Sequence, residues 1–204
     1  NSIGDKDSIS AYERELHSHL RRVGHSLSAG LKKLFKDDIF AFAKAQGEEV
    51  EHLRKEMPSS VASLTAQSRL QFKEVLEYLE ALGVEYRFAP ELVGHKNLCS
   101  ETLFAIRNEG NTLLATGYRY SRLAKRFGFK RELALVGATV YGEKKIVERK
   151  IYKEAPKPRF HFIHLGREAR LKALSLIELL RASHLPVHHL LGKERLTEQM
   201  EYAD

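Results

Sequence analysis

Apolar residues recur every three or four positions through residues 1–83, which is the spacing of amphipathic helices. Asp7 or Ser8 is the expected N-terminal cap of the first helix, and Gly24 or Gly30 is expected to end or bend it. We therefore expect residues 1–83 to form a helical layer. The stripes are Ile9, Tyr12, Leu16, Leu20, Val23 and Leu27; Leu31, Leu34 and Phe35; Val50, Leu53 and Met57 before Pro58; and Phe72, Val75, Leu76, Leu79 and Leu82 before Gly83.

Beyond Gly83 the pattern changes to short, β-rich runs that are separated by turn residues. The segment Asn108-Glu109-Gly110-Asn111 has the composition of a hairpin turn between two of these runs. Such runs predict an antiparallel sheet across residues 84–152. The expected strands lie within residues 86–88, 102–106, 112–116 and 133–140.

Residues 153–158 contain Ala155-Pro156-Lys157-Pro158, a short and stiff sequence that we interpret as a linker. In residues 159–204 the pattern predicts a strand at 160–163, a helix at 168–183, a strand at 187–191 and a helix at 194–202. This β-α-β-α order implies parallel strands joined by a right-handed crossover. The expected fold class is therefore α/β (α+β).

The chain is basic: its 204 residues hold 34 Lys and Arg against 27 Asp and Glu, a formal charge of +7. This balance favours an anionic partner, most often a nucleic acid. The single cysteine, Cys99, excludes an intrachain disulfide and is typical of a reducing compartment, so we expect a cytoplasmic protein. No run of about 18 apolar residues and no basic-then-apolar leader occurs, so we expect neither a membrane span nor a signal peptide.

The stretch from Leu92 to Leu123 resembles the two histidine-recognition motifs of the histidyl-tRNA synthetases, a family of class II aminoacyl-tRNA synthetases. The first motif reads Leu-Val-Arg-Gly-Leu-Asp-Tyr-Tyr-Thr in the family, and the second reads Gly-Gly-Arg-Tyr-Asp. The positions that match are Leu92, Val93, Thr102 and Phe104 in the first motif and Gly117, Arg119, Tyr120 and Leu123 in the second.

The substitutions within this resemblance fall on the chemical positions. Gly94 stands where the family has its catalytic Arg, and Asn97 stands where it has an Asp. The family's Tyr pair is replaced by Leu98 and Cys99, and the Asp of the second motif by Ser121. Removing a preorganised charged group of this kind typically raises a reaction barrier by about 2.7–4 kcal/mol. The resemblance therefore implies a synthetase frame whose amino-acid site has been dismantled.

The resemblance extends along the chain, from the opening Asn1-Ser2-Ile3-Gly4 segment to residues 159–204, which resemble the first half of the family's anticodon-binding domain. Residues 135–144 resemble the third class motif, in which an Arg helps to hold ATP. Lys144 or Lys145 stands there, and lysine lacks the planar fork of arginine. We therefore expect no cofactor, with ATP and Mg implied only if the chain is part of a working ligase.

Basic residues gather directly after the second motif. Their pattern places Arg119, Arg122 and Arg126 on one face of a predicted helix, where they would follow a phosphate backbone. A solvated face without a ligand is the equal alternative. The complete basic set is Arg119, Arg122, Lys125, Arg126, Lys130 and Arg131, and the pairs Lys32-Lys33 and Lys144-Lys145 have the same two interpretations.

Two further groups of residues have the composition of a chemical site, one of a metal site and one of a catalytic nucleophile, but we favour a structural role for both. His184, His188 and His189, with His161 and His164, have the number of ligands that a metal site needs, but Pro186 interrupts the helical spacing, so we expect no metal. Cys99 with His95 has the composition of a nucleophile and its base, but an inert buried thiol is the favoured interpretation.

Two functions remain open. The first is a non-catalytic relative of the synthetases that binds tRNA or other RNA, or a protein partner, which includes a second copy of itself. The second is a fragment of a divergent histidine–tRNA ligase. The first is favoured because scaffold positions persist while Gly94, Asn97 and Ser121 replace chemical ones.

Overall fold

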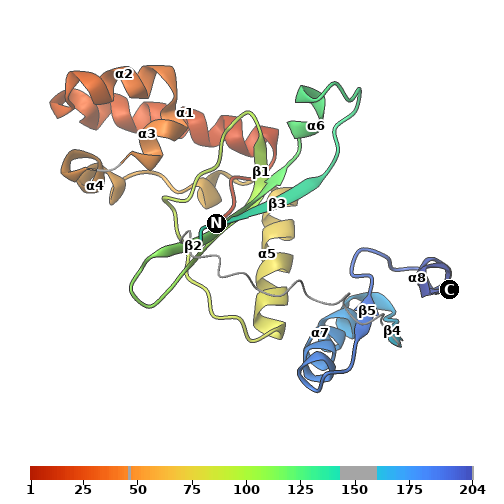
Figure 1. Ribbon diagram of the computed structural model, residues 1–204. Helices are drawn as coiled ribbons and strands as arrows, with labels where there is room; N and C mark the ends of the chain where they lie inside the picture. Colours follow the sequence, from red (N-terminus) through yellow and green to blue (C-terminus); the bar gives the residue numbers. More distant parts are fainter. Residues whose placement is uncertain (46, 143–159, 204) are drawn as a thin grey trace. The chain divides into compact units, whose positions relative to one another are not determined.

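The computed structural model describes residues 1–45, 47–142 and 160–203 (Figure 1). The chain divides into two compact units, one formed by Asn1–Phe72 with Phe88–Lys145 and the other by Lys73–Arg87 with Ile146–Asp204. The predicted limits 1–83, 84–152 and 159–204 stay predictions, and the predicted linker at 153–158 lies outside the described residues.

Helix α1 (Lys6–Val23) carries the longest predicted stripe, and Ile9, Tyr12 and Leu16 are buried along it. Its cap is Asp5, whose carboxylate accepts a hydrogen bond from the amide of Ser8 at 2.8 Å, so the expected cap at Asp7 or Ser8 is wrong. The error has a simple cause, because only Asp5 precedes the first helical residue while the other two already have helical backbone.

The middle of the helical layer contains more helices than the stripes predict: α2 (Ala29–Asp37), α3 (Ile39–Lys44) and α4 (Glu48–Arg54). Asp38 separates α2 from α3, since its extended backbone ends one helix and its side chain caps the next by accepting from Phe40 and Ala41. Short 3-10 turns occur at Gly24–Ser26 (η1) and Ser60–Ser63 (η2). The ring of Phe40 meets that of Tyr12 edge to face, at 5.7 Å between centroids.

Helix α5 (Ala66–Ala81) ends where the pattern predicts, at Gly83. The glycine has a φ of +65°, and the amides of Gly83 and Val84 donate to the carbonyls of Glu80 and Leu79. This arrangement is a Schellman cap, which requires a left-handed residue and so favours glycine.

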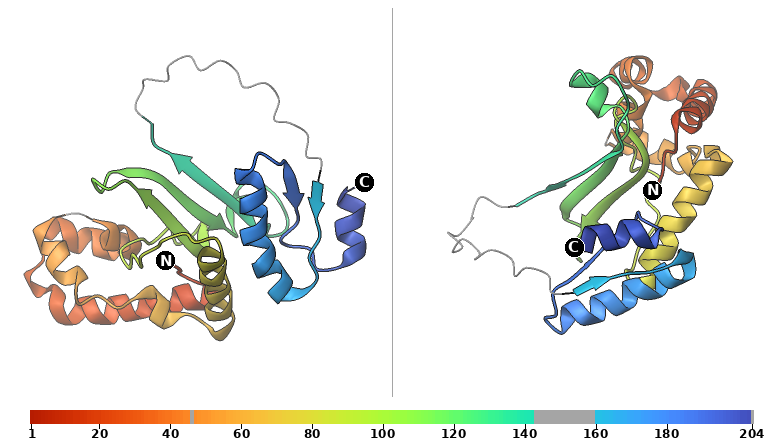
Figure 2. Two further views of the ribbon diagram at one scale, coloured as in Figure 1. Left: turned by 90° about the horizontal axis from the view of Figure 1, so that it is seen from below. Right: turned by 90° about the vertical axis from the view of Figure 1, so that its right-hand side faces the viewer.

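A three-stranded antiparallel sheet follows, with the order β1 (Cys99–Arg107), β2 (Leu113–Tyr120), β3 (Leu135–Val140), and Figure 2 shows it from two more sides. The Asn108–Asn111 hairpin joins β1 to β2 as predicted. The expected strand at residues 86–88 is wrong, because Phe88 lies in irregular backbone and packs edge-on against Phe72 of α5 at 6.1 Å.

The segment Asn1–Gly4 runs along the outer side of β1. The amide of Ile3 donates to the carbonyl of Glu101 at 3.0 Å, and the amide of Glu101 donates to the carbonyl of Gly4 at 2.8 Å. Glu101 has a φ of 54°, which is uncommon for a residue with a side chain and marks a bulge in β1. One apolar core joins α1–α4 to this sheet through Val93, Cys99 and Leu103.

Strand β3 is the outer strand of the sheet among the described residues. Val136 and Val140 point to one face and are 83% and 79% exposed. Phe104 and Ile106 of β1 share that face by cross-strand register and are also exposed. Among the described residues of the first unit, this face of the sheet is therefore apolar and exposed.

Residues 160–203 of the second unit have the predicted β-α-β-α order: β4 (Phe160–Phe162), α7 (Gly166–Ala182), β5 (Val187–His189) and α8 (Leu196–Ala203). Strands β4 and β5 are parallel, as that order requires. A small core of Ala173, Ile177 and Val187 holds α7 on the two strands. The mixed α/β class with an antiparallel sheet is thus confirmed.

Candidate functional site

Gly94 lies at the entrance to β1 in closely packed surroundings. A Cβ atom added there would lie 2.6 Å from Cβ of Cys99 and 2.7 Å from Cδ2 of Leu103, distances that real Cβ atoms essentially never show. Both neighbours are buried. The structure therefore has no space for a side chain at position 94, and an arginine in this backbone would need Cys99 and Leu103 to move.

The thiol of Cys99 is a packing group in this arrangement. It is buried, and it accepts a hydrogen bond from the amide of His95 at 3.3 Å. Burial raises the pKa of Cys99 above its ordinary value, so the thiolate is disfavoured. Asn97 is exposed, and Leu98 packs on the main core.

Gly117 faces an aromatic ring. Phe104 is its cross-strand partner, and a Cβ on Gly117 would lie 2.1 Å from Cε1 of Phe104. The ring of Phe104 thus occupies the space above the glycine. The absence of a side chain at Gly117 has a structural reason within the sheet itself.

Arg119 lies in β2, paired with Ser100 of β1 and Val136 of β3, so its predicted place on a helix is wrong. Tyr120 continues the strand, and the helical turn that follows, α6, spans Leu123–Arg126. The local i, i+3, i+7 spacing of arginines was misleading, because pairing with β3 fixes this backbone as extended.

The polar residues beneath the second motif face one another across β1 and α5. The hydroxyl of Ser68 donates to Oε1 of Glu101 at 3.2 Å, while Oε2 of Glu101 is buried and has no hydrogen-bond partner among the described residues. Burial raises the pKa of Glu101, opposed by the Ser68 hydrogen bond and the charge of Arg119. Burial also raises the pKa of Tyr120, whose ring packs on the main core near Tyr118. Ser121 follows as a half-buried residue in a bend.

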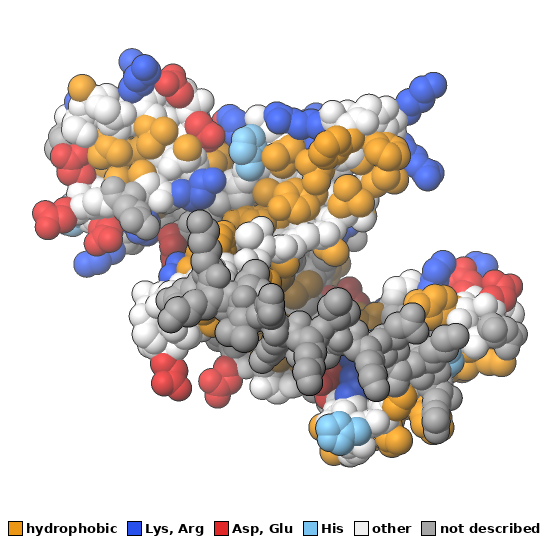
Figure 3. Space-filling model, in the orientation of Figure 1, with side chains coloured by type: hydrophobic (Ala, Val, Ile, Leu, Met, Phe, Trp, Pro, Cys, Tyr) orange, Lys and Arg blue, Asp and Glu red, His pale blue; other side chains and the backbone are white. Residues whose placement is uncertain are grey.

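The other basic residues form a surface around α6. Arg122 directly precedes α6, and Lys125 forms an ion pair with Glu132 at 3.0 Å. Arg126, Lys130 and Arg131 are exposed. Figure 3 shows basic and hydrophobic side chains next to each other at the end of the molecule that carries α6. The structure thus brings this part of the predicted set together on a loop, while Arg119 lies in the adjoining strand.

Phe127 and Phe129 belong to the same surface, although the sequence interpretation did not include them. They are 75% and 57% exposed, which is unusual for phenylalanine. The signal was present in the chain, since Lys125-Arg126-Phe127-Gly128-Phe129-Lys130-Arg131 places an aromatic pair between two basic pairs.

Other predicted residues lie elsewhere. Lys144 and Lys145 are outside the described residues. Lys32 lines a cavity of about 230 Å³ in the helical layer, together with Arg21, His25 and Lys36 over the apolar side chains of Leu20, Leu27 and Phe35.

The histidines of the second unit do not form a metal site in the part of the chain that the structure describes, where no group of three candidate ligands converges. The rings of His161 and His188 meet edge to face at 5.7 Å, next to Tyr202. His164 is buried, and within the described part of the chain neither of its ring nitrogens has a hydrogen-bond partner. Burial lowers the pKa of His164, with a further contribution from the charge of Arg170.

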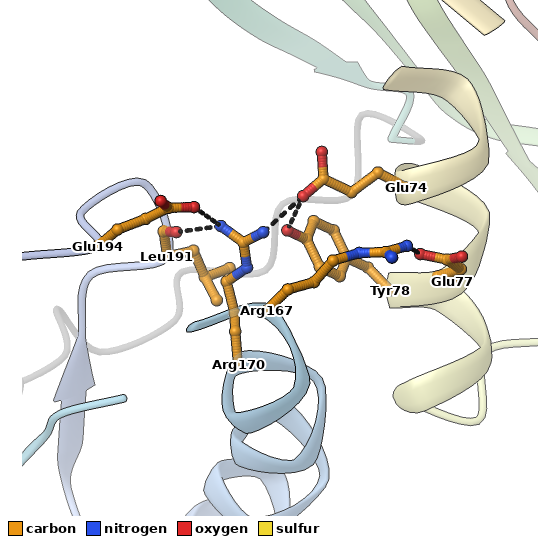
Figure 4. A network of polar contacts seen from close by, with 7 residues as sticks. All are labelled: Glu74, Glu77, Tyr78, Arg167, Arg170, Leu191 and Glu194. Atoms are coloured by element: carbon orange, nitrogen blue, oxygen red, sulfur yellow. Dashed lines mark hydrogen bonds and ion pairs between the residues drawn. The ribbon is translucent and has the colours of Figure 1, made fainter. Parts of the chain in front are cut away.

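An ion-pair network centres on Arg170 of α7, within the second unit (Figure 4). Its guanidinium binds Glu74 at 2.7 Å and Glu194 at 3.5 Å, donates to the carbonyl of Leu191 at 3.3 Å, and lies 5.5 Å from the ring centre of Tyr78. Two further contacts join the same elements, between Arg167 and Glu77 and between Tyr78 and Glu74. None of the candidate site residues predicted from the sequence takes part in these contacts, so we assign the network to the stability of the second unit.

No protein-family model matches the chain. Histidine–tRNA ligases do match: that of Rickettsia conorii is 26% identical over 191 residues, which cover 92% of this chain and 46% of the relative. That of Bacillus subtilis is 24% identical over 220 residues, covering 100% of this chain and 50% of the relative. The chain therefore spans about half the length of the curated relatives it matches.

Among solved structures, apo histidyl-tRNA synthetase of S. aureus matches with a TM-score of 0.51 and 22% identity, over 100% of this chain and 52% of that one. This likeness confirms the fold. Together with the relatives, it confirms the resemblance drawn from the two motifs, for a chain that matches part of a longer protein. Among the described residues, no helix is both long and apolar enough to cross a membrane.

Proposed function

We propose that this chain, a homologue of histidine–tRNA ligases along its whole length, is a non-catalytic protein that binds tRNA. The observation that carries the first part is the packing around Gly94. Cys99 and Leu103 lie where the side chain of an arginine would begin, so the chain lacks the guanidinium and also the space for one. A catalytic site that must stabilise developing negative charge works far more slowly without such a group.

The surface around α6 supports the second part of the proposal. Arg122, Arg126 and Lys130 provide cations around α6, and the relatives that the chain matches are histidine–tRNA ligases. A polyanion that binds such a surface releases counterions, so the affinity depends steeply on salt. The expected cytoplasmic location and a protein partner or homodimer stay predictions.

Catalysis is tested by histidine-dependent exchange of pyrophosphate into ATP and by calorimetry with histidine. We expect no exchange and no measurable heat at millimolar histidine, because Gly94, Leu98 and Cys99 replace the charged and aromatic lining of the family's pocket. Measurable exchange, or saturable binding with a micromolar constant, would instead favour the alternative, a fragment of a divergent working ligase.

RNA binding is tested by the salt dependence of tRNA affinity. Each neutralised phosphate contributes about 0.7–0.9 to the slope of log K against log salt. The variant Arg122→Glu/Arg126→Glu should lower the slope by roughly one to two. A matched control, Arg14→Glu/Lys55→Glu, makes the same change in net charge at exposed positions of α1 and the end of α4.

The control should leave the slope unchanged if the α6 surface is the contact. Equal losses in both double variants would show that only the overall charge matters. Binding that is absent, or independent of salt, would contradict the proposal and leave a protein partner as the better interpretation of the basic surface.

A further inference from the structure

The seven residues Lys125–Arg131, which we call the Phe-Gly-Phe turn, form a fixed loop at the end of α6. The amides of Phe127 and Phe129 both donate to the carbonyl of Ala124, at 3.0 and 3.2 Å, and the amide of Gly128 donates to the carbonyl of Lys125 at 3.1 Å. Gly128 has a φ of +86°. This is a complete Schellman cap, and Ala124 at its base is buried, so the turn is held to the unit by its backbone.

The cap explains why a glycine stands at position 128, but it does not use the aromatic rings of Phe127 and Phe129. A Cβ on Gly128 would meet no atom within 4 Å, so its left-handed backbone, rather than space, requires glycine there. In helix caps of this kind an apolar residue after the glycine frequently packs back on its helix. Here Phe129 stays 57% exposed and Phe127 stays 75% exposed.

Cations surround the rings. Lys125 and Arg126 precede Phe127, and Lys130 and Arg131 follow Phe129, all with exposed side chains. Glu132 pairs with Lys125 alone among the ion pairs of the described residues, and that pairing lowers the pKa of Glu132. A flat apolar ring beside several cations complements a ligand that combines flat rings with phosphates.

We propose that the Phe-Gly-Phe turn binds unpaired nucleotides of RNA, with Phe127 and Phe129 stacking on bases and the flanking cations contacting phosphates on either side. The inference deepens the proposed function and rests on it. Stacking on an aromatic side chain contributes about a 5- to 150-fold gain in affinity for each base, whatever the base is.

Unpaired nucleotides fit better than a duplex. Within a duplex, neighbouring bases cover each base face, and only edges and phosphates are open, so an exposed phenylalanine gains no stacking partner there. An anionic membrane would also attract cations next to apolar side chains. The turn provides two rings on a rigid cap rather than an amphipathic helix, and the relatives are histidine–tRNA ligases, so RNA is the partner that the observations favour.

The test compares two double variants, Phe127→Ala/Phe129→Ala and Phe127→Leu/Phe129→Leu, in binding to a single-stranded RNA oligonucleotide and to an RNA duplex. Both phenylalanine side chains are exposed, and the helix cap uses only the backbone of these residues, so both variants should fold. We expect at least a tenfold loss of single-strand affinity in both variants, little change for the duplex, and an unchanged salt slope because every cation remains.

A direct readout is available because the chain contains no tryptophan. In Phe127→Trp the new indole is the only one, and stacking on a base should quench its fluorescence when the single-stranded oligonucleotide is added. The same variant should show no quenching with the duplex.

The outcomes separate the two proposals. If the native chain binds no RNA, both are overturned. If it binds RNA with a steep salt slope and the Phe variants bind equally well, only the stacking inference is overturned. If the Leu pair retains the binding that the Ala pair loses, and the native chain binds vesicles of anionic phospholipid more tightly than RNA, the turn is a lipid contact and the inference is wrong.

Discussion

Replacing Arg170 by methionine should loosen α7 of the second unit. Methionine keeps most of the apolar stem of Arg170 but removes the contacts to Glu74, Glu194 and the Leu191 carbonyl. Removing one partner of a fully buried ion pair typically costs about 3–5 kcal/mol.

The cost here should be lower. The side chain of Arg170 is 10% exposed, but those of Glu74 and Glu194 retain 37% and 71% exposure, so the carboxylates that are left behind regain water. Partial solvation reduces the loss to about 2–3 kcal/mol, which includes about 0.5–1 kcal/mol for the lost contact with the Tyr78 ring. A loss of about 2 kcal/mol increases the open fraction of the unit roughly 30-fold.

Hydrogen exchange of α7 amides, followed by mass spectrometry, measures this directly. A single unfolding midpoint would be ambiguous because the chain has two units. The matched control is Arg167→Met, one turn earlier on α7, since Arg167 is mostly exposed and Glu77 is its ion-pair partner among the described residues. If Arg170→Met accelerates α7 exchange no more than Arg167→Met does, Arg170 is not the centre of the network.

Three further predictions concern single positions. Gly117→Ala should destabilise the sheet by about 1–3 kcal/mol in urea unfolding, because its methyl group meets the Phe104 ring, and Phe104→Leu in the same chain should recover part of the loss. Gly94→Ala should cost a similar amount through its contact with Cys99, and a variant as stable as the native chain would show that this packing is loose. Burial lowers the pKa of His164 in the folded chain below its ordinary value of 6.5. As the pH drops through about 6.5, the imidazole of His164 therefore takes up a proton in the unfolded chain before it does so in the folded chain, and stability falls. His164→Leu should flatten that fall in denaturation series between about pH 7 and pH 5, and an identical fall in both proteins would assign it to other groups.

The helices and the second unit were predictable because their signals are local. The stripe through Ile9, Tyr12 and Leu16 has the helical period and is buried as expected. The β-α-β-α order of residues 160–203 is also visible along the chain, and it predicted that β4 and β5 are parallel. The division between α2 and α3 was missed, because a single capping residue, Asp38, does not change the apolar period.

The candidate site was less predictable, because its geometry depends on contacts between distant residues. The position of Arg119 depends on pairing with Val136, and the ring above Gly117 depends on the register that places Phe104 opposite. Spacing along the chain contains neither fact. The sequence showed that a glycine replaces the arginine at position 94, but not that the site is too closely packed for a side chain. That packing depends on the distances to Cys99 and Leu103, which require the folded backbone.

The outer strand β3 has a practical consequence for the chain when it is studied alone. The segment from Val136 to Val140 carries no charge and no proline, and its outer backbone groups pair with no strand among the described residues. Such an edge templates the addition of strands from other molecules. We expect insoluble material to form with a rate that rises steeply with protein concentration. Val136→Lys, which places a charge on this exposed position, should suppress that loss without a change in melting temperature.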